Sequence, residues 1–376
     1  MILRRIEAVS PAKRSIGSYT LEAMAKTIRK RTKTARKKQP ARAVSLPLPT
    51  TTIDHVADAA GVSTATISRF FNAPDMLSKA TAERVRAAVG RIGYVPNMMA
   101  GGLASSRSRL VAAVIPAISQ SIFSSTIQAL TDSLAEVGYT VMLGLTGAAD
   151  EHLQRQLLSI IGRRPDGIIL TGSLLDASAR QQLKATRIPT IETWDLPAAP
   201  IDLVVGLSHE AVGIAVARRA LSRNRRRAFV ISATGVRALA RRYSFSRTML
   251  ESGAPVPTTA TFSGTTSFGQ GRSAIAAHLD GGGRPEIVVC SSDWSAHGVL
   301  DELLRRDIRV PDDIAVIGFG DLDFAADLNP SLTTVKIDGG VIGRQAATFL
   351  MQRARGEKIE KPIVDIGFSL IVRNSG

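Results

Sequence analysis

Residues 51–72 constrain the fold of this chain more than any other stretch, because they predict two short amphipathic helices joined by a tight corner. Gly61 can adopt the positive φ that ends a helix, and Ser63 is a suitable N-cap for the next one. Two helices around such a corner form a helix-turn-helix, whose shape fits the major groove of DNA. An unrelated helical hairpin gives a similar pattern, so the flanking sequence must decide. The first helix has apolar residues at i, i+3, i+4 and i+7: Ile53, Val56, Ala57 and Ala60.

The flanking sequence favours the DNA-binding interpretation. Residues 77–93 predict a third capped helix, and Pro96-Asn97 predicts the start of a fourth. From Thr52-Ile53 to Gly93-Tyr94-x-Pro96-Asn97 and beyond, residues 51–103 resemble the headpiece of the lactose-repressor (LacI) family of bacterial transcription regulators. The resemblance implies a transcriptional repressor that binds double-stranded operator DNA in the bacterial cytoplasm, associated with the nucleoid.

The resemblance also implies roles for individual residues of the second helix. Arg69 is the candidate for a bidentate bond to guanine O6 and N7, with a phosphate contact as the alternative. Thr64 and Ala65 occupy the family's variable base-reading positions, where Ala65 can offer only a methyl group. Four further side chains carry hydroxyl or amide groups suited to phosphate oxygens: Ser63, Thr66, Ser68 and Asn72.

Residues 96–108 resemble the family's hinge helix and linker. Asn97 begins the helix, and Leu103 is by position the residue that wedges into the minor groove at the operator centre. Gly101 and Gly102 depart from the usual pattern, and each glycine costs about 1 kcal/mol of helix stability relative to alanine. We therefore expect the hinge to fold only when two copies pair on the operator as a homodimer.

The basic excess of the chain lies mostly in residues 1–49. They hold 13 Lys and Arg against two acidic residues, and so contribute 11 of the 16 net positive charges. Few apolar residues and several prolines predict a disordered tail that is attracted to polyanions. A mitochondrial transit peptide is also rich in Arg and poor in acid, but here a bacterial headpiece follows. Met24 is a possible alternative start.

From Arg109 onward, short apolar runs alternate with helical patterns, which predicts parallel sheets covered by helices. A length of 376 residues already predicts at least two domains, and about ten strands favour two sheets over one. The expected strands are 110–115, 140–145, 167–170, 189–191, 203–205, 228–231, 287–289 and 314–318, and the clearest helices are 122–137, 209–221, 243–251, 295–306 and 341–355.

The resemblance extends over residues 109–376 and implies a two-lobed effector domain like the periplasmic binding proteins. The predicted fold class is therefore α/β with parallel sheets, preceded by an all-α headpiece at residues 50–95. Crossings of the chain between lobes are expected near Leu207, near 318–322 and near Phe349. Lobe 1 would then hold about 109–207 and 320–349, and lobe 2 about 208–319 and 350–376. The matching landmarks are Gly167-Ile168-Ile169-Leu170, Asp293-x-x-Ala296-x-Gly298, Val310-Pro311-Asp312-Asp313, Gly318-Phe319 and Leu332-Thr333-Thr334-Val335.

A small-molecule effector should bind between the lobes, at the carboxyl ends of the strands. The resemblance implies that Asp293 contacts ligand hydroxyls and that Arg241 contacts a hydroxyl or an anionic group. Trp194 is a candidate apolar wall, with plain core packing as the alternative. Asp321 is a candidate for a ligand or hinge role, although Gly318-Phe319-Gly320-Asp321 lacks the first Asp of the usual pattern.

Residues 199–206 and 365–370 resemble the gluconate-utilisation repressor branch most, which indicates a sugar acid whose carboxylate pairs with Arg241. A neutral sugar, a phosphosugar or a purine stays open as the effector. The chain has no leucine-rich heptads at its end, so a dimer is expected rather than a tetramer.

Two other classes of protein share the effector fold. An enzyme is disfavoured because the chain has no phosphate-binding G-x-x-x-x-G-K-[ST] loop, no H-E-x-x-H and no G-x-S-x-G, and neither cofactor nor metal is expected. A secreted sugar-binding protein would need a signal peptide and would lack a headpiece. Cys290 is the single cysteine, which excludes an intramolecular disulfide and fits a reducing cytoplasm. The uncharged run 110–131 contains Pro116 and several polar residues, so it predicts a strand, a loop and a helix rather than a membrane span.

Overall fold

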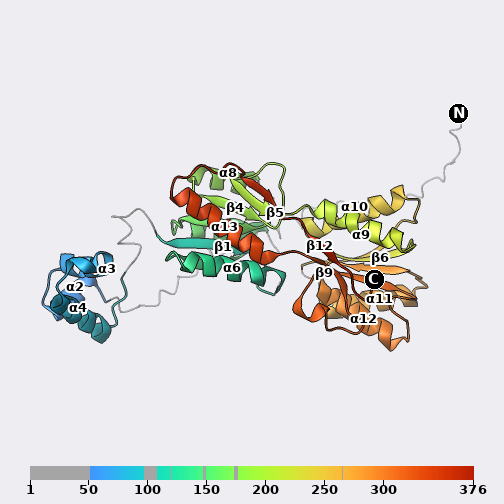
Figure 1. Cartoon of the computed structure of the whole chain (residues 1–376), viewed down its shortest axis with the longest axis horizontal. Coiled ribbons are helices and arrows are strands. Elements are labelled where there is room, and N and C mark those ends of the chain that lie inside the picture. Colours follow the sequence, from blue (N-terminus) through green and yellow to red (C-terminus); the bar gives the residue numbers. More distant parts are fainter. Residues whose placement is uncertain (1–50, 97–107, 120, 147–149, 173–176, 265) are drawn as a thin grey trace, which may run out of the picture. The chain divides into compact units, whose positions relative to one another are not determined.

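The computed structural model describes residues 51–96, 108–119, 121–146, 150–172, 177–264 and 266–376 (Figure 1), and of residues 150–155 it describes the backbone only. The chain divides into two compact units, residues 1–96 and 97–376. The basic tail and the hinge positions Asn97 and Leu103 lie outside the described residues, and the expectations for them stay predictions.

Residues 51–96 contain three α-helices around one small apolar core. They are α2 (Ile53–Ala60), α3 (Thr64–Asn72) and α4 (Lys79–Ile92), with the 3-10 turn η1 (Pro74–Met76) before α4. Gly61 ends α2 in the left-handed conformation, at φ 63°, and the Ser63 side chain caps α3 by accepting a hydrogen bond from the backbone N–H of Thr66. The predicted helix-turn-helix is confirmed, and its core consists of Val56, Ala57, Ala60, Ile67, Val85 and Ala88.

The second unit contains two six-stranded sheets. The sheet of lobe 1 consists of β1 (Leu110–Ile115), β2 (Thr140–Leu145), β3 (Gly167–Thr171), β4 (Thr190–Thr193), β5 (Leu203–Gly206) and β11 (Ile363–Asp365). The sheet of lobe 2 consists of β6 (Ala228–Ala233), β7 (Thr258–Phe262), β8 (Ile287–Cys290), β9 (Ala315–Gly320), β10 (Thr333–Lys336) and β12 (Ser369–Ile371). The strand orders are β11-β5-β4-β3-β1-β2 and β12-β10-β9-β8-β6-β7. The described pairings are parallel except for β10 with β12, which confirms the predicted α/β class.

Helices cover both faces of each sheet (Figure 1). Lobe 1 carries η2 (Ser121–Phe123), α6 (Ser124–Ala135), α7 (Asp150–Ile161), α8 (Ala177–Thr186) and α13 (Gly339–Ala354). Lobe 2 carries α9 (His209–Ser222), α10 (Val236–Glu251), α11 (Phe268–Asp280), α12 (Asp293–Arg305) and η3 (Asp323–Ala325). The neighbouring pairs are α6 with α13, α9 with α10, and α11 with α12. Central strands such as β3 and β5 are buried along their whole length, as parallel strands between two helical layers must be.

The main chain crosses between the lobes three times. The first crossing lies at Leu207, between β5 and α9, where the sequence placed it. The other two predicted crossings are wrong. The chain stays in lobe 2 after β9, because β10 pairs with β9, and it returns to lobe 1 only at 337–338. Phe349 lies inside α13, and the last crossing is at 366–368, between β11 and β12.

Glycines bring the paired helices into backbone contact. A Cβ on Gly271 of α11 would lie 2.0 Å from the carbonyl oxygen of Ser295, and a Cβ on Gly298 of α12 would lie 2.0 Å from that of Phe268. Between α9 and α10, a Cβ on Gly213 would lie 2.3 Å from the Arg241 carbonyl oxygen. Any side chain at these positions would push the helices apart, because the obstructing atoms belong to the backbone.

We expect Gly271→Ala to lower the free energy of unfolding by about 1–3 kcal/mol through overpacking of α11 against α12. Gly269→Ala is the matched control, since it lies in the same helix, is exposed, and its added Cβ meets nothing within 4 Å. Urea unfolding followed by circular dichroism measures both changes. Equal effects of the two substitutions would contradict the close-packing interpretation.

Candidate nucleic-acid interface and ligand cleft

The outer face of α3 carries short polar side chains and one guanidinium. Thr64, Ala65, Ser68 and Arg69 are all exposed, while Ile67 on the opposite face is fully buried. Within the described ranges Arg69 forms no ion pair, so its guanidinium is available to a partner outside the chain. A helix surface of this kind can enter a major groove without steric obstruction.

The other predicted contact residues of α3 also organise the helix itself. The Ser63 hydroxyl accepts the backbone N–H of Thr66 at 3.3 Å and lies 3.0 Å from the Thr66 hydroxyl. Asn72 donates through Nδ2 to the Ser68 carbonyl oxygen at 2.9 Å. These bonds satisfy groups at the helix ends, and their roles toward phosphate remain predictions.

A cleft of about 650 Å³ lies between the lobes, at the carboxyl ends of both sheets. Lobe 1 lines it with the segments that follow β1, β3 and β4, and lobe 2 with those that follow β6, β7 and β8. The volume is typical of a small-molecule site, and the position is the one expected for open parallel sheets.

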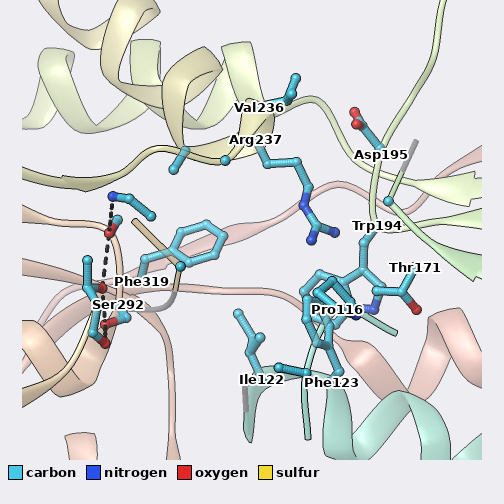
Figure 2. Close-up of a pocket in the computed structure, with 18 of the residues that line it drawn as sticks. Pro116, Ile122, Phe123, Thr171, Trp194, Asp195, Val236, Arg237, Ser292 and Phe319 are labelled. Atoms are coloured by element: carbon cyan, nitrogen blue, oxygen red, sulfur yellow. Dashed lines mark hydrogen bonds between the residues drawn. The ribbon is translucent and has the colours of Figure 1, made fainter. Parts of the chain in front are cut away.

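Aromatic rings form the lobe 1 wall of this cleft (Figure 2). The rings of Trp194 and Phe123 meet edge to face with centroids 5.1 Å apart. Trp194 is 2% exposed, and its Nε1 donates to the hydroxyl of Thr126 at 3.1 Å. The structure thus places Trp194 both in the core and along the cleft.

Two guanidiniums enter the cleft from successive turns of α10. The Cζ atom of Arg241 lies 3.7 Å from the ring centroid of Phe319, and its Nη1 lies 3.0 Å from Nδ1 of His209. The Cζ atom of Arg237 lies 5.2 Å from the ring centroid of Phe123 (Figure 2). Burial, together with the charge of Arg237, lowers the pKa of Arg241 to about 9, so Arg241 is cationic at neutral pH. Burial also lowers the pKa of Arg237, but a guanidinium keeps its proton in proteins.

His209 connects this charged pair to lobe 1. An arginine can only donate, so Nδ1 of His209 accepts from Arg241 and Nε2 carries the proton, which it donates to the Trp194 carbonyl oxygen at 2.8 Å. Burial and then the charge of Arg241 lower the pKa of His209 to about 3. His209 is therefore neutral and holds one tautomer.

Hydroxyl groups line the lobe 2 side of the cleft. The hydroxyl of Thr266 lies 3.2 Å from that of Ser291 and 2.8 Å from that of Ser292, as the dashed lines of Figure 2 show. A network of this kind can exchange hydrogen bonds with the hydroxyls of a polyol, because each group both donates and accepts.

The described lining of the cleft does not include Asp293 or Asp321, and their ligand contacts stay predictions. Asp293 is fully buried, and its oxygens accept the Thr334 hydroxyl at 2.5 Å and the Leu322 N–H at 2.8 Å. Burial raises its pKa to about 6. Asp321 pairs with Arg373 at 2.7 Å and with Lys336 at 3.4 Å. The carboxylates therefore fix the chain around β9 and β10, and Ser292 faces the cleft instead of Asp293.

Sequence reasoning missed Arg237 and His209. It began the helix at Tyr243, whereas α10 begins at Val236, directly after Gly235. A spacing of four residues between Arg237 and Arg241 was the available signal, since it places both on one helical face.

Two other kinds of site receive no support from the described part of the chain. No three of its His, Cys, Asp and Glu side chains gather as metal ligands there. Nor does any helix in that part combine the length and apolar character needed to cross a bilayer.

Comparisons with known proteins follow the same two-part organisation. Residues 52–97 match a family described as bacterial regulatory proteins, lacI family, and residues 208–376 match a periplasmic binding protein-like domain. The HTH-type transcriptional regulator GntR of Pseudomonas aeruginosa is 31% identical over 86% of this chain and 95% of its own length. The HTH-type transcriptional repressor CytR of Escherichia coli is 28% identical over 86% and 96%. A solved LacI-family regulator from Silicibacter pomeroyi superposes with a TM-score of 0.81, at 29% identity over 88% of this chain and 99% of that one.

We expect acid to destabilise the protein through His209. Its pKa is about 3 when folded against an ordinary 6.5, so the unfolded state binds a proton that the folded state refuses, and stability falls as pH drops below about 6.5. Between pH 7 and pH 5 this contributes a loss of up to about 2 kcal/mol.

The buried Asp293 acts in the opposite direction, because its raised pKa favours the folded state as pH falls through about 6. The effect of His209 is therefore measured as a difference between wild type and His209→Gln, which keeps a donor for the Trp194 carbonyl. Urea unfolding at pH 7 and pH 5 should show the smaller loss in the variant. Identical losses would show that His209 is not the group that titrates.

Proposed function

This chain belongs to the lacI family of bacterial regulatory proteins, and we propose that a sugar acid bound in its cleft controls its affinity for operator DNA. The family is shown by the 31% identity to GntR over 86% of this chain and 95% of that relative. The relatives are transcriptional regulators, which supports the prediction of a DNA-binding repressor over that of an enzyme.

The pair of guanidiniums carries the sugar-acid proposal. Arg237 and Arg241 line one cleft with a single carboxylate, Asp195, among the described lining residues, and His209 beside them is neutral. An anion would balance this charge, and the hydroxyl network and aromatic wall suit a polyol chain. A neutral sugar or a purine would leave the positive charge unbalanced, and is therefore the weaker candidate.

On the DNA side, we propose that α3 enters the major groove of each half-site of a pseudo-palindrome, bound by a homodimer in the bacterial cytoplasm. Arg69 would read guanine, Thr64 and Ala65 would contact neighbouring bases, and Leu103 would enter the minor groove. A ligand held by both lobes changes DNA affinity by its differential affinity for the two arrangements of the lobes, typically about 1–3 kcal/mol.

We expect Arg69→Ala to relax sequence preference at one symmetric base pair per half-site. A bidentate contact to guanine contributes about 1–3 kcal/mol of discrimination, so that preference should fall at least several-fold while affinity for random DNA changes little. Fluorescence anisotropy on an operator selected from a random library, with each half-site position varied, measures the effect. Arg84→Ala removes an exposed charge from α4 and serves as the control. An equal loss on all sequences would make Arg69 a phosphate contact.

We expect D-gluconate or a related aldonate to bind the full-length chain more tightly than D-glucose, D-glucitol or hypoxanthine, because only the acid neutralises the arginine pair. Isothermal titration calorimetry ranks the ligands, and anisotropy with and without the tightest one measures the change in operator affinity, expected at about 5- to 150-fold. Tighter binding of a neutral sugar or of the purine would refute the sugar-acid proposal.

A further inference from the structure

We infer that Arg237, rather than Arg241, takes the anionic group of the ligand, and that its position makes this charge the signal for lobe closure. The inference rests on the proposed binding of an anionic polyol in the cleft.

Arg241 is already held by its surroundings. Its Nη1 donates to His209 at 3.0 Å, its Nη2 lies 3.5 Å from the Ser291 carbonyl oxygen, and the Phe319 ring covers one face of the guanidinium at 3.7 Å. A carboxylate on the Nη1–Nη2 edge would compete with His209, whose Nδ1 would lose its donor. Arg241 therefore acts as a positioning residue that fixes the cleft wall.

Arg237 has weaker contacts, because its Cζ lies 5.2 Å from the Phe123 ring centroid and the nearby charge of Asp195 stabilises its charged form. Its Nη1 is buried and has no hydrogen-bond partner among the described residues. A buried N–H without an acceptor is unfavourable, and an oxyanion would remove that penalty while pairing with the charge. Gly172 lies against the same guanidinium, because a Cβ there would be in van der Waals contact with it, 3.6 Å from Cζ of Arg237.

The start of α10 adds to the attraction for an anion. Residues 234–238 line the cleft, and no side chain caps the helix N-terminus at Gly235 within the part of the chain that the structure describes. Uncapped amide N–H groups and the positive end of the helix dipole favour negative charge at this place. Arg237 belongs to the first turn of the same helix, so both features act on one bound group.

Arg237 also joins the two lobes. It belongs to lobe 2, yet its guanidinium lies near Phe123 of lobe 1 (Figure 2) and against Gly172 of the same lobe. An oxyanion bound there contacts a group that spans the cleft, whereas the hydroxyl network of Thr266, Ser291 and Ser292 belongs to lobe 2. The anion thus controls closure, and the hydroxyls contribute affinity.

The experiment compares a charged ligand with its neutral analogue. Calorimetry on the full-length chain gives the affinity ratio of D-gluconate to D-glucitol, and of D-glucose 6-phosphate to D-glucose, since a carboxylate and a phosphate are both terminal oxyanions. The variants are Arg237→Gln, Arg237→Lys, Arg241→Gln and the control Arg247→Gln, which removes a charge of α10 that pairs with Glu210 at the surface. Thermal unfolding establishes that each variant is folded.

In Arg237→Gln the charged-to-neutral ratio should fall by about tenfold or more, as expected for loss of a charge-assisted pair, while affinity for the neutral polyol stays near that of wild type. In Arg237→Lys the charged-to-neutral affinity ratio should lie between those of Arg237→Gln and wild type, because lysine keeps the charge. Arg241→Gln should weaken both ligands by a similar factor and keep the ratio, and Arg247→Gln should change neither. Small-angle scattering should show compaction by the charged ligand in wild type but not in Arg237→Gln.

An unchanged ratio in Arg237→Gln, or a collapse of the ratio in Arg241→Gln, would overturn the inference and leave the sugar-acid proposal intact. If D-glucose 6-phosphate binds through Arg237 and no aldonate binds wild type, the sugar-acid proposal fails and the inference stands. If neither anion binds wild type at 10 mM, both fail.

Discussion

The three crossings of the main chain between the sheets are the constraint on which the effector domain depends. They hold the carboxyl ends of both sheets against one cleft, so the loops that carry polar groups converge from two lobes. The crossings are themselves apolar and buried at Leu207 and Ile337, within a hydrophobic cluster that runs from one lobe into the other. Separating the lobes at this cluster would expose apolar area to water, which is unfavourable.

Arg237 and Arg241 line the same cleft, and His209 beside them is neutral and so adds no third positive charge. Its ring accepts from Arg241 and donates to the Trp194 backbone, so a lobe 2 side chain is tied to a lobe 1 loop through one fixed tautomer. A charged imidazolium would repel the guanidinium and could not accept its N–H. The chain Arg241–His209–Trp194–Thr126 thus keeps the aromatic wall in place while Arg237 remains available to an anion.

Local sequence patterns predicted the helices and strands whose buried residues follow a regular spacing. The helices of the headpiece and the strands β1 and β2 have the expected bounds, because capping residues or apolar runs define their ends. The exposed edge strand β7 and the three-residue β11 have no apolar run and were missed. Family landmarks located the cleft and two of its side chains, Trp194 and Arg241, but not Arg237, His209 or Ser292. Asp293 and Ser292 are adjacent, and Asp293 is turned away from the cleft by its hydrogen bond with Thr334 of β10, a contact between residues 41 positions apart. The contact of Arg237 with Phe123 joins residues more than a hundred positions apart, and no local pattern encodes it.

Arginine side chains serve different purposes in the two units, because Arg69 is exposed to water and the Nη1 atom of Arg237 is buried. Arg69 lies in water on α3, so its charge is hydrated until it meets a base, and its contribution is discrimination between bases rather than a large gain in affinity. The Nη1 atom of Arg237 is already removed from water, so pairing with an anion requires little further desolvation of the cation and the interaction acts in a low-dielectric environment. A guanidinium with one buried N–H that lacks an acceptor, placed between the two lobes, is therefore suited to respond to one negative charge, which is the property that a ligand-controlled regulator requires of its cleft.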